Sequence, residues 1–231
     1  MRNNTMDVVR GIAFGCMLVH HVAYFSSDAS PTLRTAIHPT VQMFGTVARH
    51  LFIVLAGYAL AVQFRQTDAD ARTTTTHTWS KRLYRCLEVG THAVLISIVT
   101  YVCYPDRWVR FGILHFLCVA LLMASTLMQS AHHEILAIGV IACLLCAPVT
   151  NTWLDVVSGA RPHYAMIDWF PLASWFPWLW MGVLLGKYVP LPSVSASSGV
   201  LAGVSWVGRN SLPLYTAHFV LFCALSRYGR V

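Results

Sequence analysis

The chain has 231 residues, of which 56% are hydrophobic and only 11% are charged. A soluble domain carries about 25% charged residues, so this composition excludes an ordinary soluble protein. The apolar runs are longer than strands, and they predict an all-α polytopic membrane helix bundle. The net charge of +7 does not indicate nucleic-acid binding, because many basic residues gather between positions 65 and 86. The positive-inside rule predicts this clustering for a cytoplasmic loop. We expect one domain, 1–231, embedded in the lipid bilayer.

Seven apolar segments come close to the ~20 residues that cross the hydrocarbon core. We predict about seven transmembrane helices at 8–25, 42–64, 87–104, 109–128, 134–150, 169–188 and 211–227.

The orientation of these segments follows from the basic loop. If residues 65–86 are cytoplasmic, then the N-terminus is cytoplasmic too, and the loops 26–41, 105–108 and 151–168 face outward or into a lumen. The stretch 190–208 is too polar to span and is predicted to be a loop with at most a short helix. No small-residue cleavage site follows the first apolar run, so we expect no cleavable signal peptide.

Ionisable side chains interrupt the apolar segments. A charge at bilayer depth costs about 2.5–3.5 kcal/mol on insertion scales, so such residues are functional candidates. The residues concerned are His20, His21, Arg49, His50, His92, His115 and His218.

The first segment carries Asp7 and Arg10 three residues apart, on one helix face where they can pair. Arg10 and His21 share a face about 16 Å apart, which suits a long cofactor lying along the helix. The alternative is that Arg10 snorkels to lipid headgroups and His21 is an interfacial residue. We expect a structural role for His20, which points elsewhere.

Arg49 has no acidic neighbour in the sequence around it. Its guanidinium therefore needs a phosphate or carboxylate ligand, or an acidic partner in another helix. Asp168 and Glu88 are the alternative partners.

The seven cysteines are scattered, and most fall in apolar runs where thiols pack as small hydrophobes. Cys143 and Cys146 have CxxC spacing, but no second pair completes a zinc site. We expect no metal.

Five blocks of residues, spread over 7–218, resemble the heparan-α-glucosaminide N-acetyltransferase catalytic-domain family. Each block alone is weakly specific, but five in the same order are fairly specific. The blocks are Asp7-x-x-Arg10-Gly11-Ile12-Ala13 with His21 downstream, Arg49-x-Leu51-Phe52-Ile53-x-Leu55-Ala56-Gly57, Phe111-Gly112-Ile113-Leu114-His115, Asp168-x-x-Pro171-Leu172-x-x-Trp175, and Gly208-Arg209-Asn210-Ser211-Leu212-x-x-Tyr215-x-x-His218.

The resemblance implies acetyl transfer from cytosolic acetyl-CoA, as co-substrate, to a sugar amine or a related acceptor across the membrane. This sequence departs from the lysosomal animal enzymes in two ways. It lacks their luminal domain, and their position corresponding to His21 is not histidine. Their proposed catalytic histidine lies in the loop after the first helix, where His38 is the only histidine here. Either His21 or His38 is then the candidate for that role.

The residues themselves fit acyl transfer. A neutral imidazole can deprotonate an amine or hydroxyl, or accept the acetyl group itself. We expect His21 to take this role, with His115 and His218 as further catalytic candidates. Arg10 and Arg49 would bind the pyrophosphate or polarise the thioester carbonyl. Asp168 would orient a histidine or pair with Arg49.

Two other functions compete with the acyltransferase. Histidines on several helices are compatible with a haem-binding bundle, although the repeated paired-histidine pattern of such bundles is missing. A non-enzymatic membrane transporter, or an inactive relative, would also explain the apolar helices. A homo-oligomer is compatible with all of these functions.

Overall fold

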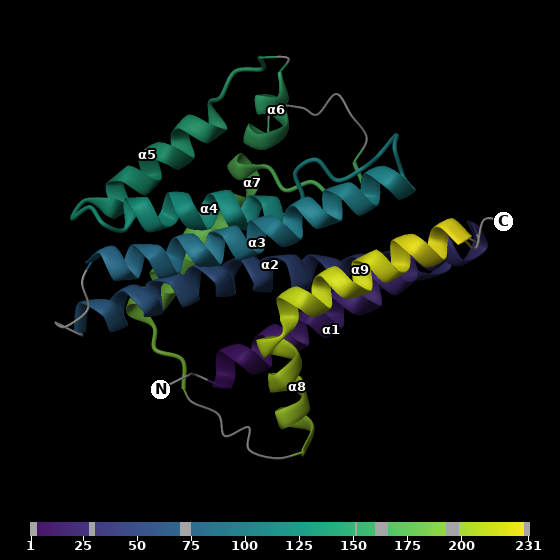
Figure 1. Cartoon of the computed structure of the whole chain (residues 1–231), viewed down its shortest axis with the longest axis horizontal. Coiled ribbons are helices and arrows are strands. Elements are labelled where there is room, and N and C mark those ends of the chain that lie inside the picture. The colour runs from purple at the N-terminus through teal and green to yellow at the C-terminus, as the bar shows by residue number, and fades with distance from the viewer. Residues whose placement is uncertain are drawn as a thin grey trace. The chain divides into compact units, whose positions relative to one another are not determined.

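The computed structural model describes residues 4–27, 31–69, 75–150, 152–159, 166–192 and 199–228. Within these ranges the chain is helical, and the only β-type pairing is an isolated bridge between Phe111 and Trp169 (Figure 1). The predicted all-α class is therefore confirmed.

The helices follow the predicted apolar segments and add two short elements. Their bounds are α1 (Asn4–Ser27), α2 (Pro31–Ala69), α3 (Thr75–Cys103), α4 (Ile113–Leu127), α5 (His133–Leu145), α6 (Trp153–Ser158), α7 (Leu172–Tyr188), α8 (Gly199–Arg209) and α9 (Ser211–Tyr228). Helix α6 lies in the predicted loop 151–168. Helix α8 occupies most of the second half of the stretch 190–208 and has 11 residues, so the predicted short helix there is confirmed.

Two predicted loops are wrong in their extent, because the helices beside them continue through polar residues. Helix α2 begins at Pro31, so His38 lies in a helix and not in a loop at 26–41. Proline is favoured at the first helical position, where its missing N–H is not needed. The basic loop 65–86 also shrinks, because α2 continues to Ala69 and α3 begins at Thr75. Polar residues such as Gln and Arg sustain a helix well beyond its apolar part.

In the part of the chain that the structure describes, three helical stretches are long and apolar enough to cross a membrane, namely Asn4–Phe25, Pro39–Gln66 and Trp79–Cys103. Shorter apolar helices accompany them. Helix α5, with 13 residues, is about 20 Å long, less than the ~30 Å of a hydrocarbon core. The chain is thus a helical membrane protein by length and composition, and the count of seven spans stays a prediction.

The chain divides into two compact units, which we describe separately. Unit 1 contains Met1–Phe52 and Leu191–Val231, and unit 2 contains Ile53–Pro190. Unit 1 therefore holds α1, the first part of α2, α8 and α9, and unit 2 holds the rest of α2 and α3 to α7. The predicted single domain stays a prediction.

In unit 1 the helix α1 packs against both α8 and α9 (Figure 1). Gly208 of α8 touches the backbone of α1 so closely that a Cβ atom there would lie 1.7 Å from the carbonyl oxygen of Asp7. Any side chain would force the two helices apart, so glycine is what permits this close contact between α8 and α1.

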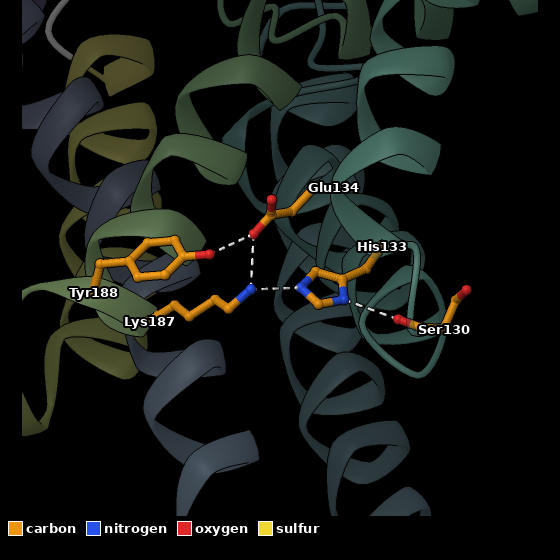
Figure 2. Close-up of polar contacts among 5 residues, drawn as sticks. All are labelled: Ser130, His133, Glu134, Lys187 and Tyr188. Carbon is orange, nitrogen blue, oxygen red and sulfur yellow. Dashed lines mark hydrogen bonds and ion pairs between the residues drawn. The ribbon is translucent and has the colours of Figure 1, made fainter.

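In unit 2 a similar contact joins α2 and α7, where a Cβ on Gly182 would lie 2.0 Å from the carbonyl oxygen of Val54. A polar cluster joins α5 to the end of α7 (Figure 2). Lys187 Nζ donates to Glu134 Oε1 at 2.7 Å and to His133 Nε2 at 3.1 Å. The hydroxyl of Tyr188 donates to the same Glu134 oxygen at 2.6 Å.

Candidate functional site

Two histidines that are distant in the sequence meet inside unit 1. His21 of α1 and His218 of α9 are joined by a hydrogen bond of 2.8 Å between Nδ1 of His21 and Nε2 of His218. Their ring planes are 19° apart and their ring centroids are separated by 5.1 Å. His218 is buried, with 9% of its surface exposed, and His21 is half-buried. The structure therefore brings two of the five predicted catalytic residues into direct contact.

Helix periodicity places the residues that surround this pair. Tyr215, His218, Phe219 and Phe222 recur at helical spacing along α9, so they share the face that meets α1. The Tyr215 ring lies 6.3 Å from His21, and the Phe219 ring lies 5.5 Å from it. From α1, the edge of Phe14 packs against His218 at 5.5 Å. The pair thus sits among aromatic rings of α1 and α9.

The short distance within the pair restricts its chemistry. The two axial nitrogens of a haem iron lie on opposite sides of the iron and about 4 Å apart, because each metal–nitrogen bond is about 2 Å long. The 2.8 Å contact between His21 and His218 is instead the length of a hydrogen bond. In this arrangement the pair is suited to proton transfer and not to joint ligation of a haem iron.

Arg49 belongs to the same unit, and its guanidinium is held by its own helix. Nε donates to the carbonyl oxygen of Gly45 at 3.1 Å, and Nη2 donates to Thr46 Oγ1 at 3.1 Å. The charge of Arg49 interacts electrostatically with the imidazoles of His20 and His21. The positive charge of Arg49 therefore acts on His21, one member of the pair.

The predicted ion pair at the start of α1 is confirmed. Arg10 Nη1 lies 3.8 Å from Asp7 Oδ1, and the Asp7 side chain is only 2% exposed whereas Arg10 is 26% exposed. Because α1 is one continuous helix, Arg10 and His21 lie about 16 Å apart along its axis. Arg10 is thus held by a buried carboxylate and still partly open to a ligand.

Two further candidates, His115 and Asp168, lie together in unit 2 at the start of α4. Nδ1 of His115 accepts a hydrogen bond from the Gly112 amide at 3.3 Å, and Asp168 Oδ2 accepts one from the Ile113 amide at 3.1 Å. Both side chains satisfy amides that the first turn of a helix leaves without intrahelical partners. These contacts favour a structural role, and the predicted catalytic roles stay predictions.

His115 also lies 3.1 Å from Ser97 Oγ, through its Nε2 atom. In this serine–histidine contact the hydrogens do not lie where a nucleophile and its base require them. The Gly112 amide donates to Nδ1, so the proton of a neutral imidazole sits on Nε2. The Ser97 hydroxyl in turn donates to the Val109 carbonyl at 2.7 Å. His115 therefore cannot accept the serine proton in this arrangement.

The remaining candidate, His38, lies on α2, and its side chain is outside the described part of the chain. Tyr215 contacts the ring pair and Thr46 contacts the Arg49 guanidinium, and neither is among the site residues predicted from the sequence. Tyr215 precedes His218 by three residues and Thr46 precedes Arg49 by three, so same-face helical spacing was the available signal.

Comparison with known protein families agrees with this description. The family model described as "Heparan-alpha-glucosaminide N-acetyltransferase, catalytic" matches residues 2–220, nearly the whole chain. The chain belongs to this family. Family membership confirms the resemblance seen in the five blocks and indicates a membrane acetyltransferase that depends on acetyl-CoA. No curated protein and no solved structure matches the chain.

Proposed function

We propose that this family member transfers an acetyl group from cytosolic acetyl-CoA to a sugar amine or a related acceptor across the membrane. The observation that carries the proposal is the part-buried His21–His218 pair, found in a chain that matches the acetyltransferase family over residues 2–220. An imidazole can serve as a catalytic base or as a nucleophile.

The roles of the residues follow from their groups and positions. His21 is the base that takes the acceptor proton or the nucleophile that carries the acetyl group. Arg49, with a guanidinium fixed by Gly45 and Thr46, polarises the thioester carbonyl or binds phosphate. Arg10, near the start of α1, binds the pyrophosphate of acetyl-CoA. His38 remains the alternative to His21.

The orientation completes the proposal. Arg65 lies near the end of α2, and Lys81, Arg82 and Arg85 lie in the first turns of α3, so these basic residues border the same connection. By the positive-inside rule this connection is cytoplasmic. The N-terminus, two spans earlier, is then cytoplasmic as well, which places Arg10 at the side from which acetyl-CoA arrives.

An acceptor screen tests the function. The protein purified in lipid nanodiscs is incubated with isotope-labelled acetyl-CoA and a panel of amino sugars and hydroxyl acceptors, and the acetylated products are identified by mass spectrometry. We expect transfer to at least one amine acceptor and its loss in His21→Ala. The control is His132→Asn, which changes an exposed histidine in the turn before α5 and should keep full activity.

Calorimetry with acetyl-CoA separates the competing functions. Binding without transfer to any acceptor would favour an inactive relative. Neither binding nor transfer would contradict the proposal and favour a transporter. Full transfer by His21→Ala would leave the function intact and move the catalytic role to another histidine, with His38 the first to be substituted.

A further inference from the structure

We infer that His218 is a positioning residue that fixes the tautomer of His21 and leaves Nε2 of His21 as the reacting atom. The inference rests on the proposed function, because it concerns the same site. It follows from the hydrogen-bond partners of the two rings, which determine which ring nitrogen carries the hydrogen in each.

The backbone of α9 determines which nitrogen of His218 carries the hydrogen. Nδ1 of His218 lies 3.0 Å from the carbonyl oxygen of Leu214. A carbonyl oxygen can only accept a hydrogen bond, so Nδ1 of His218 carries the hydrogen. A neutral imidazole has one N–H, and Nε2 of His218 is therefore an acceptor.

The acceptor nitrogen of His218 in turn determines which nitrogen of His21, on α1, carries the hydrogen. Nε2 of His218 faces Nδ1 of His21 at 2.8 Å. Two lone pairs at this distance would repel, so Nδ1 of His21 must carry the hydrogen and donate it. The remaining nitrogen of a neutral His21, Nε2, is then a lone-pair atom. The aromatic residues around the pair disfavour buried charge and so favour the neutral form of both imidazoles.

The carbonyl group of Leu214 on α9 thus determines which nitrogen of His21 on α1 reacts. Among the described residues, Nε2 of His21 makes no hydrogen bond, whereas both nitrogens of His218 are engaged. This is the arrangement in which a second group orients a catalytic imidazole. Here a histidine takes the place that a carboxylate often has.

The proton count of the reaction is consistent with this assignment. A neutral amine attacks the thioester carbonyl carbon, and its proton moves to Nε2 of His21. The C–S bond then breaks, the acetyl group stays on the amine, and the CoA thiolate takes the proton back from Nε2. During the reaction the His21 imidazolium keeps its Nδ1–H bond to His218, which holds the ring in place.

Two variants at one position separate positioning from packing. In His218→Gln the side-chain Oε1 reaches the place of Nε2 and still accepts from His21. In His218→Phe the ring volume stays and the acceptor is lost. Nitrogen NMR of histidine-labelled protein reports which nitrogen carries the hydrogen, and the His21 signals are assigned by their absence in His21→Asn.

We expect Nδ1-protonated His21 in the wild type and in His218→Gln, and Nε2-protonated or mixed His21 in His218→Phe. We expect kcat to fall about 10²-fold in His218→Phe with KM unchanged, as general-base effects allow, and to recover mostly in His218→Gln. A wild-type His21 protonated on Nε2 would overturn the inference, even if His218→Phe fails to fold. So would a His218→Phe protein with an unchanged tautomer and unchanged kcat. The spectrum needs no activity, so it still decides the inference if no acceptor is found and the proposed function fails.

Discussion

His21 in unit 1 and His133 in unit 2 are both half-buried imidazoles on helices of a membrane protein. They differ in how many of their ring nitrogens make hydrogen bonds. Nδ1 of His133 donates to the Ser130 carbonyl at 2.8 Å, and its Nε2 accepts from the Lys187 ammonium at 3.1 Å (Figure 2). Both of its nitrogens are engaged. His21 uses one nitrogen for its partner and keeps the other.

His115 of unit 2 resembles His133 in that both of its ring nitrogens are engaged, one by the Gly112 amide and the other by the Ser97 hydroxyl. A histidine within an apolar segment is therefore not by itself a catalytic signal. The number of ring nitrogens that the fold leaves available separates the candidate base in unit 1 from the structural imidazoles in unit 2. Variants that remove one nitrogen at a time test this comparison.

The largest expected effect is on His21. In His21→Asn the side-chain amide keeps the donor to His218 but lacks Nε2, so we expect acetyl transfer to fall about 10²- to 10⁴-fold, the range for loss of a general base, with little change in unfolding temperature. The matched variant in unit 2, His115→Asn, keeps the acceptor for Gly112 and should lose less than about 10-fold. Equal losses of kcat in the His21 and His115 variants would show that the two histidines do not differ as catalytic base and structural residue.

The next largest effect is expected on stability, when a glycine at a close helix contact is replaced. Gly208→Ala places a methyl group against the backbone of Asp7, and overpacking of this kind costs about 1–3 kcal/mol. Gly139 of α5 has open space around its Cβ position, so Gly139→Ala should be neutral or stabilise by up to about 1 kcal/mol. Unfolding in the same detergent measures both. A stable Gly208→Ala protein would show that α8 is not held to α1 by this contact.

A smaller effect is expected at Asp168. Asp168→Ala leaves the Ile113 amide without the acceptor seen at 3.1 Å, and loss of such a capping oxygen costs about 0.5–2 kcal/mol. Asp168→Asn keeps an oxygen in place and should restore most of the stability. If both variants unfold like the wild type but lose acetyl transfer, then Asp168 acts in catalysis and the structural interpretation is wrong.

The smallest effect is expected in the cluster of Figure 2. The Lys187–Glu134 pair is partly exposed, with 33% and 46% of the two side chains accessible, and exposed ion pairs contribute little to stability. Glu134→Gln should therefore leave activity and unfolding temperature within error at physiological salt. A clear drop in either would show that this cluster holds α5 to α7 more strongly than its exposure suggests.

The sequence predicted most of the helices, because long apolar runs have few alternatives in a membrane. It misplaced helix ends where polar residues continue a helix, as at His38 and after Arg65. It also selected His115 and Asp168 by their place in family-like blocks. The contact of Asp168 with the first turn of α4 joins residues that are 55 positions apart in the sequence, and no spacing rule predicts such a contact.

Composition, hydropathy and the order of five blocks determined by themselves that this chain is a helical membrane protein of an acetyltransferase family. Those properties depend on local sequence and on the cost of charge in lipid. Only the tertiary structure decided that His21 meets His218, 197 residues later, and that His115 spends both nitrogens on its neighbours. Hydrogen bonds between helices depend on which faces meet, and a one-dimensional pattern leaves those faces undetermined.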